Sequence, residues 1–361
     1  MIKLAPYKGE PDKARLIAAM RGEKVDRVPY FETLIEDKHV EAFLGRYAGN
    51  TLAYGGDPAK GIEEAEGARP MYPKDYIELC RLIGQDVILV EALWTPFKKM
   101  KNGKRVLVGD RSIKSREDFT QLFMPEEQDI EPQVQYIREY KEAVEGTRIG
   151  VAVLFGAFFQ TVYEFLFPMQ EFMLQVHDDR EFVEEMLEIS ADYWVKFVKA
   201  MIEEGVDIMY PADDIAYNSG LFIRPAIFKS LWLPRVKRIY EPILNAGLPI
   251  HFHSDGKLDD IVEDSIEAGV TCLTPMDPYG IDYRDYKKRY GHRIALHGNI
   301  DIQRPLVEGT PEDVERDVKE HMEVLKPGGG YIAGSSHSIV NYIPHENYIT
   351  MINAIHKYGR Y

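Results

Sequence analysis

Short apolar segments alternate with longer amphipathic segments along most of the chain. The apolar runs predict strands at 27–32, 86–92, 149–154, 206–210, 248–253, 270–275, 294–297 and 330–333. Segments with helical periodicity lie around and between them, at 10–22, 129–145, 179–204, 225–246, 258–268 and 310–325. Short buried strands that alternate with helices are typical of βαβ units, which build a parallel sheet.

The number of these units separates two parallel-sheet architectures. Eight strands over about 330 residues suit a closed (β/α)8 TIM barrel. A doubly wound open sheet is the alternative, but no Gly-rich dinucleotide-binding turn follows an early strand. The sequence therefore predicts an α/β protein, a (β/α)8 TIM barrel with an N-terminal helical extension at 10–22.

Domain organisation is less clear from length, because 361 residues would ordinarily suggest two domains, whereas barrels often exceed the usual domain size. We expect residues 1–361 to form a single TIM-barrel domain. Residues from about 33 to 80 are polar and are rich in glycine around Gly49–Gly67. This stretch is expected to be a lid or cap insertion.

Charge and composition exclude several classes of partner. The formal net charge is −15, from 59 acidic and 44 basic residues, so the average field repels nucleic acid and anionic lipid. The chain shows no apolar run long enough to span a membrane and no apolar leader after its basic start, which predicts a cytoplasmic protein. Cys80 and Cys272 belong to no paired-cysteine motif and are expected to be ordinary buried thiols.

Candidate chemistry is concentrated in the segment Pro249–Gly256, which runs Pro-Ile-His-Phe-His-Ser-Asp-Gly. Side chains alternate sides along a strand, so His251, His253 and Asp255 should share one face. Such a row is costly to bury without a polar partner or an ion. The pattern favours a metal or catalytic role, with a hydrogen-bonded core role as the alternative.

Further polar residues follow other predicted strands, at the end where TIM barrels carry their active sites. Ser-Ser-His-Ser at 335–338 follows the last strand. His253, Asp255 and His337 would supply two imidazoles and a carboxylate, a set that suits zinc with an open position or another divalent first-row metal. His251 lies two residues deeper and is expected in the barrel interior.

Two acids are candidate catalytic residues. Glu91 ends the second predicted strand, and Asp213 ends the fourth in the sequence Tyr-Pro-Ala-Asp-Asp at 210–214. Of the two adjacent aspartates, we expect Asp213 to face the barrel axis. Either Asp213 or Glu91 would complete the coordination of a metal or carry a proton.

Aromatic residues also follow the third predicted strand: Phe155, Phe158, Phe159 and Tyr163. They would either line a pocket for a planar or apolar substrate or pack beneath the rim of the barrel. The pattern leaves both interpretations open.

Several of these segments together resemble the uroporphyrinogen decarboxylase superfamily, a family of (β/α)8 barrels. The resemblance covers roughly residues 200–361, and the amino-terminal half is similar through the opening helix and Asp-Arg-Val-Pro at 26–29. The motifs are His-Ser-Asp-Gly-Lys-Leu at 253–258, Met-Asp at 276–277, His-Gly-Asn-Ile-Asp at 297–301, Pro-Gly-Gly-Gly-Tyr-Ile at 327–332 and Ser-Ser-His-Ser at 335–338.

The resemblance implies one of two chemistries. Members that decarboxylate porphyrinogens carry an arginine-rich segment after the first strand, which grips substrate carboxylates. The corresponding stretch here, 29–36, is Pro-Tyr-Phe-Glu-Thr-Leu-Ile-Glu, with two acids and no arginine. A substrate that bears many carboxylates would meet repulsion there, so uroporphyrinogen decarboxylation is disfavoured.

The other branch contains corrinoid-dependent methyltransferases, whose zinc is held by a His-x-Cys-Gly strand end and a later Cys or His. His253 matches the first of these ligands and His337 the last, whereas Asp255 stands at the cysteine position. An aspartate is a harder ligand than a thiolate. It makes an oxygen substrate more suitable than a thiol acceptor.

The resemblance therefore implies a zinc-dependent methyltransferase that moves a methyl group between a small substrate, such as an aryl methyl ether, and the cobalt of a separate corrinoid protein. The chain has no Asp-x-His-x-x-Gly segment of its own to bind cobalamin. A decarboxylase or lyase that acts on another acid, and a non-catalytic binding barrel, are the alternatives. The decarboxylase relatives also suggest a homodimer by analogy.

Overall fold

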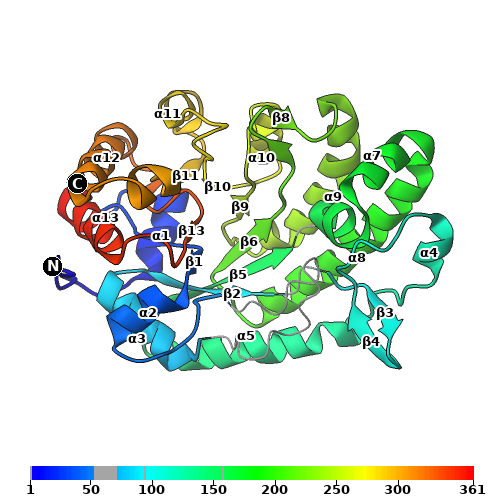
Figure 1. The fold of residues 1–361 in the computed structure, drawn as a ribbon, viewed down its shortest axis with the longest axis horizontal. Helices are drawn as coiled ribbons and strands as arrows, with labels where there is room; N and C mark the ends of the chain where they lie inside the picture. Colours follow the sequence, from blue (N-terminus) through cyan, green and yellow to red (C-terminus); the bar gives the residue numbers. More distant parts are fainter. Residues whose placement is uncertain (1, 53–70, 93–94, 157) are drawn as a thin grey trace.

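A curved parallel sheet forms the centre of the molecule (Figure 1). The computed structural model describes residues 2–52, 71–92, 95–156 and 158–361. In the described part, a seven-stranded sheet has the order β12-β11-β10-β9-β6-β5-β2, with every pair parallel. Its strands are β2 (Val87–Glu91), β5 (Gly150–Gly156), β6 (Ile208–Ala212), β9 (His251–His253), β10 (Cys272–Thr274), β11 (Ala295–His297) and β12 (Tyr331–Ile332).

An eighth segment closes the sheet. Tyr30 forms parallel bridges to Gln85, just before β2, and to Ala333, just after β12. Phe31 N–H donates to the Ala333 carbonyl at 3.0 Å, and Ala333 N–H donates to the Pro29 carbonyl at 2.9 Å. The predicted first strand, 27–32, is thus reduced to isolated bridges, of which those of Tyr30 join both edges of the sheet, while Arg27 forms an antiparallel bridge to Arg360. The predicted (β/α)8 fold is confirmed.

Helices cover the outside of the sheet, and all six predicted helical segments are present. These are α1 (Lys13–Met20), α5 (Glu131–Ala143), α8 (Arg180–Glu203), α9 (Pro225–Asn245), α10 (Val262–Glu267) and α12 (Pro311–Leu325). Thr310 and Asp313 form a capping box at the start of α12, with Pro311 as its first residue, as the sequence indicates. Further helices are α4 (Arg116–Thr120), α6 (Phe158–Gln160), α7 (Met169–Asp178), α11 (Tyr283–Tyr290) and α13 (His345–Tyr358).

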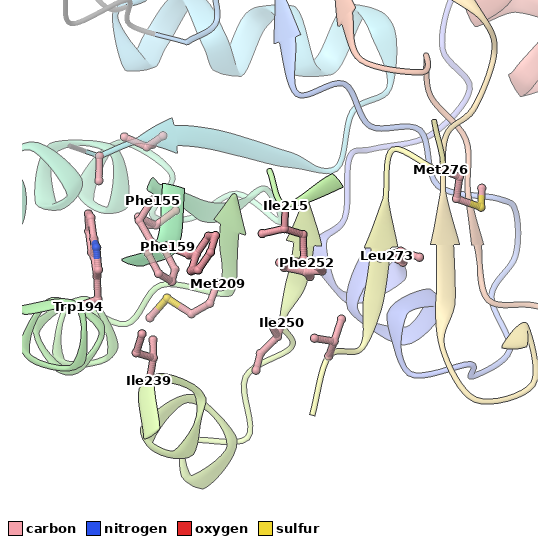
Figure 2. Packing of buried hydrophobic residues seen from close by; sticks show 14 of the residues in the cluster. Phe155, Phe159, Trp194, Met209, Ile215, Ile239, Ile250, Phe252, Leu273 and Met276 are labelled. Carbon is pink, nitrogen blue, oxygen red and sulfur yellow. The ribbon is translucent and has the colours of Figure 1, made fainter. Parts of the chain in front are cut away.

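Alternate strand residues enter two different apolar clusters. Val87 and Leu89 of β2 belong to a cluster inside the barrel, whereas Ile88 and Val90 belong to the larger cluster between sheet and helices. Figure 2 shows the outer layer, where Phe155 and Met209 lie near Trp194 of α8. Both faces of each strand are apolar because both are buried, which explains the continuous apolar runs in the sequence.

The first helix, α1, closes the barrel at the amino ends of its strands. Leu16, Ala19 and Met20 of α1 are buried in the interior cluster. The residue that caps the helix, Asp12, donates its backbone N–H to Asp86 Oδ1 at 2.7 Å, immediately before β2. The predicted N-terminal helical extension therefore lies across the amino ends of the strands, opposite the catalytic rim of such barrels.

The predicted lid at about 33–80 is described in part. It contains β1 (Leu34–Ile35), α2 (Asp37–Leu44) and α3 (Pro73–Ile83), and residues 53–70 lie outside the described residues. The lid, like the single-domain assignment, stays a prediction. Small two-stranded pairs are β1 with β13 (Ser338–Ile339), β3 (Lys98–Lys101) with β4 (Lys104–Leu107), and β7 (Ala216–Tyr217) with β8 (Gly220–Leu221).

Two expectations about the chain can be compared with the structure. Cys80 and Cys272 are free and fully buried, as predicted. Among the described residues, no helix has both the length and the apolar character needed to cross a membrane.

Candidate metal centre

Three side chains meet at the carboxyl ends of the strands. His253 ends β9, Asp255 lies two residues beyond it, and His337 immediately precedes β13. Each offers one ligand atom, and these atoms lie within 4.8 Å of one another. The structure thus brings together the three residues that the sequence nominated as metal ligands.

His253 is held from the barrel interior. Its Nδ1 lies 3.4 Å from the hydroxyl of Tyr210, whose oxygen is in turn 3.0 Å from Thr33 Oγ1. The other ring nitrogen, Nε2, faces Asp214 at 3.8 Å and Asp255 at 4.0 Å. A metal-bound imidazole is oriented by a hydrogen bond at its other ring nitrogen, and the Tyr210 hydroxyl is the group at that position here.

His337 shows the same arrangement at the other side of the mouth. Its Nδ1 is 2.7 Å from Ser338 Oγ, and its Nε2 lies 3.7 Å from Asp255. The segment before it is anchored by Ser335, whose backbone N–H and hydroxyl both donate to Glu32, at 2.9 and 2.6 Å. Glu32 is 1% exposed, and burial raises the pKa of its carboxyl group to about 8.

Asp255 is positioned by a tight turn. Its backbone N–H donates to Asp214 Oδ1 at 2.9 Å. Gly256 follows with φ +84°, and a Cβ there would lie 2.5 Å from the carbonyl oxygen of Ala216. Glycine is therefore required at this position both by its backbone conformation and by the neighbouring chain.

The expectation that Asp213 faces the barrel axis is wrong. Its carboxylate accepts hydrogen bonds from the backbone N–H of Gln160 at 2.7 Å and from Trp232 Nε1 at 3.0 Å, so it faces the helix layer. Complete burial there raises its pKa to about 8. The neighbour Asp214 takes the place beside His253, because the chain leaves β6 at Ala212 and strand alternation no longer decides the direction.

Glu91 and His251 lie apart from the ligand group. Glu91 is the half-buried last residue of β2, and its catalytic role stays a prediction. His251 is buried inside the barrel, as expected, with Nε2 3.1 Å from His297 Nδ1. Burial lowers the pKa of both imidazoles, that of His297 to about 4, so this interior pair is neutral.

The ligand spacing suits a divalent metal. The Nε2 atoms of His253 and His337 lie 4.0 and 3.7 Å from Asp255 oxygens, which is longer than a hydrogen bond. Ligand atoms around a tetrahedral zinc lie about 3.3 Å apart, and the three ligand atoms here lie within 4.8 Å of one another, so a bound metal would draw them inward. Two imidazoles and one carboxylate leave a fourth position open for a substrate atom.

Two pockets meet at Asp255. One, of about 370 Å³, is also lined by His337, Asp277, Asp301 and Tyr279. The other, of about 260 Å³, is lined by Asp255 together with Asp214, Arg111 and Tyr163. A molecule in either pocket would therefore reach the same carboxylate.

Most of the aromatic residues after β5 pack beneath the rim. Phe155, Phe158 and Phe159 are at most 1% exposed, and Figure 2 shows Phe155 and Phe159 within the outer apolar layer. Tyr163 differs from the three phenylalanines because it lines the smaller pocket, and its hydroxyl donates to the backbone carbonyl of Asp214. The packing interpretation thus holds for the three phenylalanines.

Other residues of the site carried no clear signal in the sequence. Tyr210 and Ser338 hold the two imidazoles, and a tyrosine or a serine next to a histidine is too common to predict this. Tyr279 and Tyr342 line the larger pocket from loops. Their exposure, 57% and 70%, is unusual for large aromatic residues, but only the structure shows it.

Comparison with curated proteins gives two groups of relatives. The chain is 27% identical over 169 residues to a methylcobamide:CoM methyltransferase from Methanosarcina barkeri, covering 46% of this chain and 48% of that protein. It is 33% identical over 182 residues to a uroporphyrinogen decarboxylase from Pseudoalteromonas translucida, covering 48% of each. The chain thus matches about half the length of these relatives.

Comparison with solved structures and with family models extends over more of the chain. A methyltransferase from Methanosarcina mazei has the same fold, with a TM-score of 0.68 and 17% identity over 97% of this chain and 99% of that one. The family model for uroporphyrinogen decarboxylase (URO-D) matches residues 88–358. This chain therefore belongs to the uroporphyrinogen decarboxylase family.

Proposed function

We propose that this protein is a metal-dependent methyltransferase that moves a methyl group between a heteroatom of a small substrate and the cobalt of a separate corrinoid protein. The observation that carries the proposal is the convergence of His253, Asp255 and His337 at the barrel mouth. Similarity to a methylcobamide:CoM methyltransferase supports the same chemistry.

His253, Asp255 and His337 would hold the metal, with zinc the first choice for this donor set. Bound there, it would act as a Lewis acid that polarises the substrate heteroatom. Tyr210 and Ser338 fix the two imidazoles through their Nδ1 atoms. Asp214 holds the backbone of Asp255 and is the nearest further carboxylate to His253, so it is placed to accept a proton from an acceptor substrate.

The cobalamin would come with a partner protein that docks over the mouth. A small methylated compound, such as an aryl methyl ether, is the substrate we expect, and an oxygen atom suits the aspartate ligand better than a thiol does. Homodimer formation belongs to the same set of proposals and follows the decarboxylase analogy.

A decarboxylase or lyase is the second candidate, supported by the similarity to uroporphyrinogen decarboxylases. The segment 29–36 argues against a porphyrinogen substrate. This segment contains no arginine, so it offers no cation to a substrate carboxylate. Its acid Glu32 is instead buried and accepts hydrogen bonds from Ser335.

Metal analysis of the purified protein is the first experiment. We expect about one divalent metal per chain in the wild type, and loss of most of it in His253→Ala and in His337→Ala. His292→Ala is the matched control, because His292 is exposed and outside the ligand group. A wild type that carries no metal and takes up none on addition would refute the proposal.

A second experiment separates the two activities. Metal-loaded protein is incubated with cob(I)alamin and a panel of methoxyarenes, and methylcobalamin is followed by its absorbance. Methylation that depends on His253 and His337 supports the methyltransferase. Bound metal without any methylation, together with release of CO2 from an acid substrate, would favour the decarboxylase.

A further inference from the structure

The larger of the two pockets is continuous with the candidate metal centre. It has a volume of about 370 Å³, and Asp255 and His337 form one of its walls. Its remaining walls come from loops that follow β10, β11 and β13, including Asp277, Asp301 and Tyr342. A small molecule there would lie with one end at the ligand group and the other between these loops.

Apart from the metal that the ligand group would hold, the formal charge in this pocket is of one sign. Asp255, Asp277 and Asp301 all line it, and none of the described lining residues is Lys or Arg. Within the described ranges, no Lys or Arg forms an ion pair with any of the three. Nearby acids outside the pocket differ, since Asp259 and Asp285 both pair with Arg289.

The two tyrosines that line the pocket, Tyr279 and Tyr342, are unusually exposed to solvent. Tyr279 is 57% exposed, and its hydroxyl donates to Gln303 Oε1 at 2.8 Å and lies 3.3 Å from Asp301 Oδ2. Tyr342, on the loop after β13, is 70% exposed. Aromatic faces beside unneutralised carboxylates are the surroundings in which proteins bind ammonium groups.

We propose that this pocket binds the ammonium end of a cationic substrate, whose methylated or methyl-accepting heteroatom then lies at the ligand group of His253, Asp255 and His337. The inference rests on the proposed function and names its substrate class. Carboxylates at Asp277 and Asp301 attract the cation, and Tyr279 and Tyr342 offer their rings to it. Anionic substrates and acceptors meet repulsion in the same place.

Three ligands of similar shape test the charge preference: 4-methoxybenzylamine, 4-methoxybenzyl alcohol and 4-methoxybenzoate. Their binding to the metal-loaded protein is measured by calorimetry at pH 7 without any corrinoid. We expect the amine to bind at least tenfold more tightly than the alcohol, and the carboxylate to bind more weakly than the alcohol. The preference for the amine should decrease as salt is added.

Two variants test which pocket residues cause the preference for the amine. Asp301→Asn keeps the acceptor that caps the segment Ile302–Val307 and removes only the charge. Tyr342→Leu removes an exposed ring. Each should weaken amine binding about fivefold or more and change alcohol binding less than twofold. Asp260→Asn, which removes an exposed carboxylate outside the pocket, should leave both affinities unchanged.

The outcomes separate this inference from the proposed function. Amine binding that Asp301→Asn weakens, without methylation of cob(I)alamin, would support the pocket and contradict the methyltransferase. Methylation from the alcohol and the benzoate as efficient as from the amine would support the methyltransferase and overturn the pocket. Absence of amine binding, or an amine preference that survives both variants, would also overturn it.

Discussion

At the scale of single residues, the candidate centre depends on two hydroxyl groups that are not among the proposed metal ligands. Ser338 and Tyr210 each hold the Nδ1 of one imidazole, which fixes the ring and directs Nε2 to the mouth. Without such a partner an imidazole rotates among several orientations, and only one of them suits the metal. Loss of a partner of this kind typically costs 10- to 100-fold in metal affinity.

Ser338→Ala should therefore weaken zinc binding by about tenfold while the protein stays folded. Competition with a chromophoric chelator measures the affinity. Ser265→Ala is the matched control, because Ser265 is also buried but its hydroxyl has no hydrogen-bond partner among the described residues. Equal zinc affinity in the two variants would contradict this role of Ser338.

Glu32 gives the stability a predictable dependence on pH. Burial raises its pKa from 4.5 to about 8, so the folded state keeps the proton that the unfolded chain loses above about 4.5. The stabilising contribution of the protonated form is therefore fully present below pH 4.5 and is lost as the pH rises to about 8.

Glu32→Gln should remove this dependence. Relative to the variant, the wild type should lose stability on the order of 4 kcal/mol between pH 5 and pH 8.5. Urea denaturation of both proteins at the two pH values provides the measurement. A difference between them that does not change with pH would contradict the raised pKa.

The two adjacent aspartates show where residue-level prediction from sequence stops. The side of His253 follows from strand alternation in β9, whereas Asp255 lies two residues beyond the strand and is held there by its backbone hydrogen bond to Asp214. Asp213 and Asp214 follow the end of β6, where the backbone turns and the direction of each side chain depends on contacts with Gln160 and Trp232. Those contacts join segments 19 to 53 residues apart, so no local pattern encodes them.

At the scale of elements, the turn after β9 controls the position of Asp255. The chain turns at Gly256, which has a positive φ, and passes directly against the carbonyl group of Ala216. Two separate costs would follow from a side chain here: the strained backbone, at about 1 kcal/mol, and displacement of the neighbouring chain.

Gly256→Ala should destabilise the protein by about 3 kcal/mol and also weaken metal binding, because the displaced turn carries Asp255 with it. Gly103→Ala separates the two costs. Gly103 has φ +77°, and apart from its own chain neighbours no atom of the described residues lies within 4 Å of the position that a Cβ would occupy, so Gly103→Ala should lose only about 1 kcal/mol. Equal losses in the two variants would show that the contact with Ala216 is unimportant.

The strands were predictable because burial on both faces leaves a strong signal: short apolar runs between helices. The first strand is the instructive exception, since 27–32 has the apolar pattern but, among the described residues, joins the barrel sheet only through the bridges of Tyr30. Pro29 lacks a backbone N–H and so cannot take part in a regular ladder on that side. Pattern predicted the position of this strand, and backbone chemistry limited its length.

At the scale of the whole molecule, α1 stabilises the barrel at the amino ends of its strands. Arg15 Nη1 donates to Asp86 Oδ1 at 2.6 Å, and Asp86 is 1% exposed just before β2. Burial raises the pKa of Asp86 to about 7, and the neighbouring guanidinium opposes that rise. The helix thus neutralises a carboxylate that the barrel floor buries.

Arg15→Ala should cost about 3 kcal/mol of stability at pH 8, because a buried carboxylate loses its cation. The loss should be smaller at pH 5, where Asp86 is protonated in the folded state. Arg304→Ala, in an exposed ion pair with Glu308, is the control and should have no measurable effect. A loss in Arg15→Ala that is the same at both pH values would assign it to packing instead of charge.

The architecture and the ligand set were accessible from the sequence for different reasons. Alternating elements determine a barrel through general packing rules, and a barrel places the strand ends on one rim. His253 and His337 could be associated only through that rim, because 84 positions separate them. The sequence could not predict that Tyr279 and Tyr342 line the pocket, because loop conformations do not follow from hydrophobic periodicity.

The seam between the first and last barrel segments also sets an order of events during synthesis. Glu32 anchors Ser335, and β1 pairs with β13, so His337 reaches its place only when the beginning and the end of the barrel meet. A nascent chain that still lacks its last strands would offer His253 and Asp255 alone. Metal would therefore be captured firmly only after the ribosome has completed the barrel, as a late step of maturation.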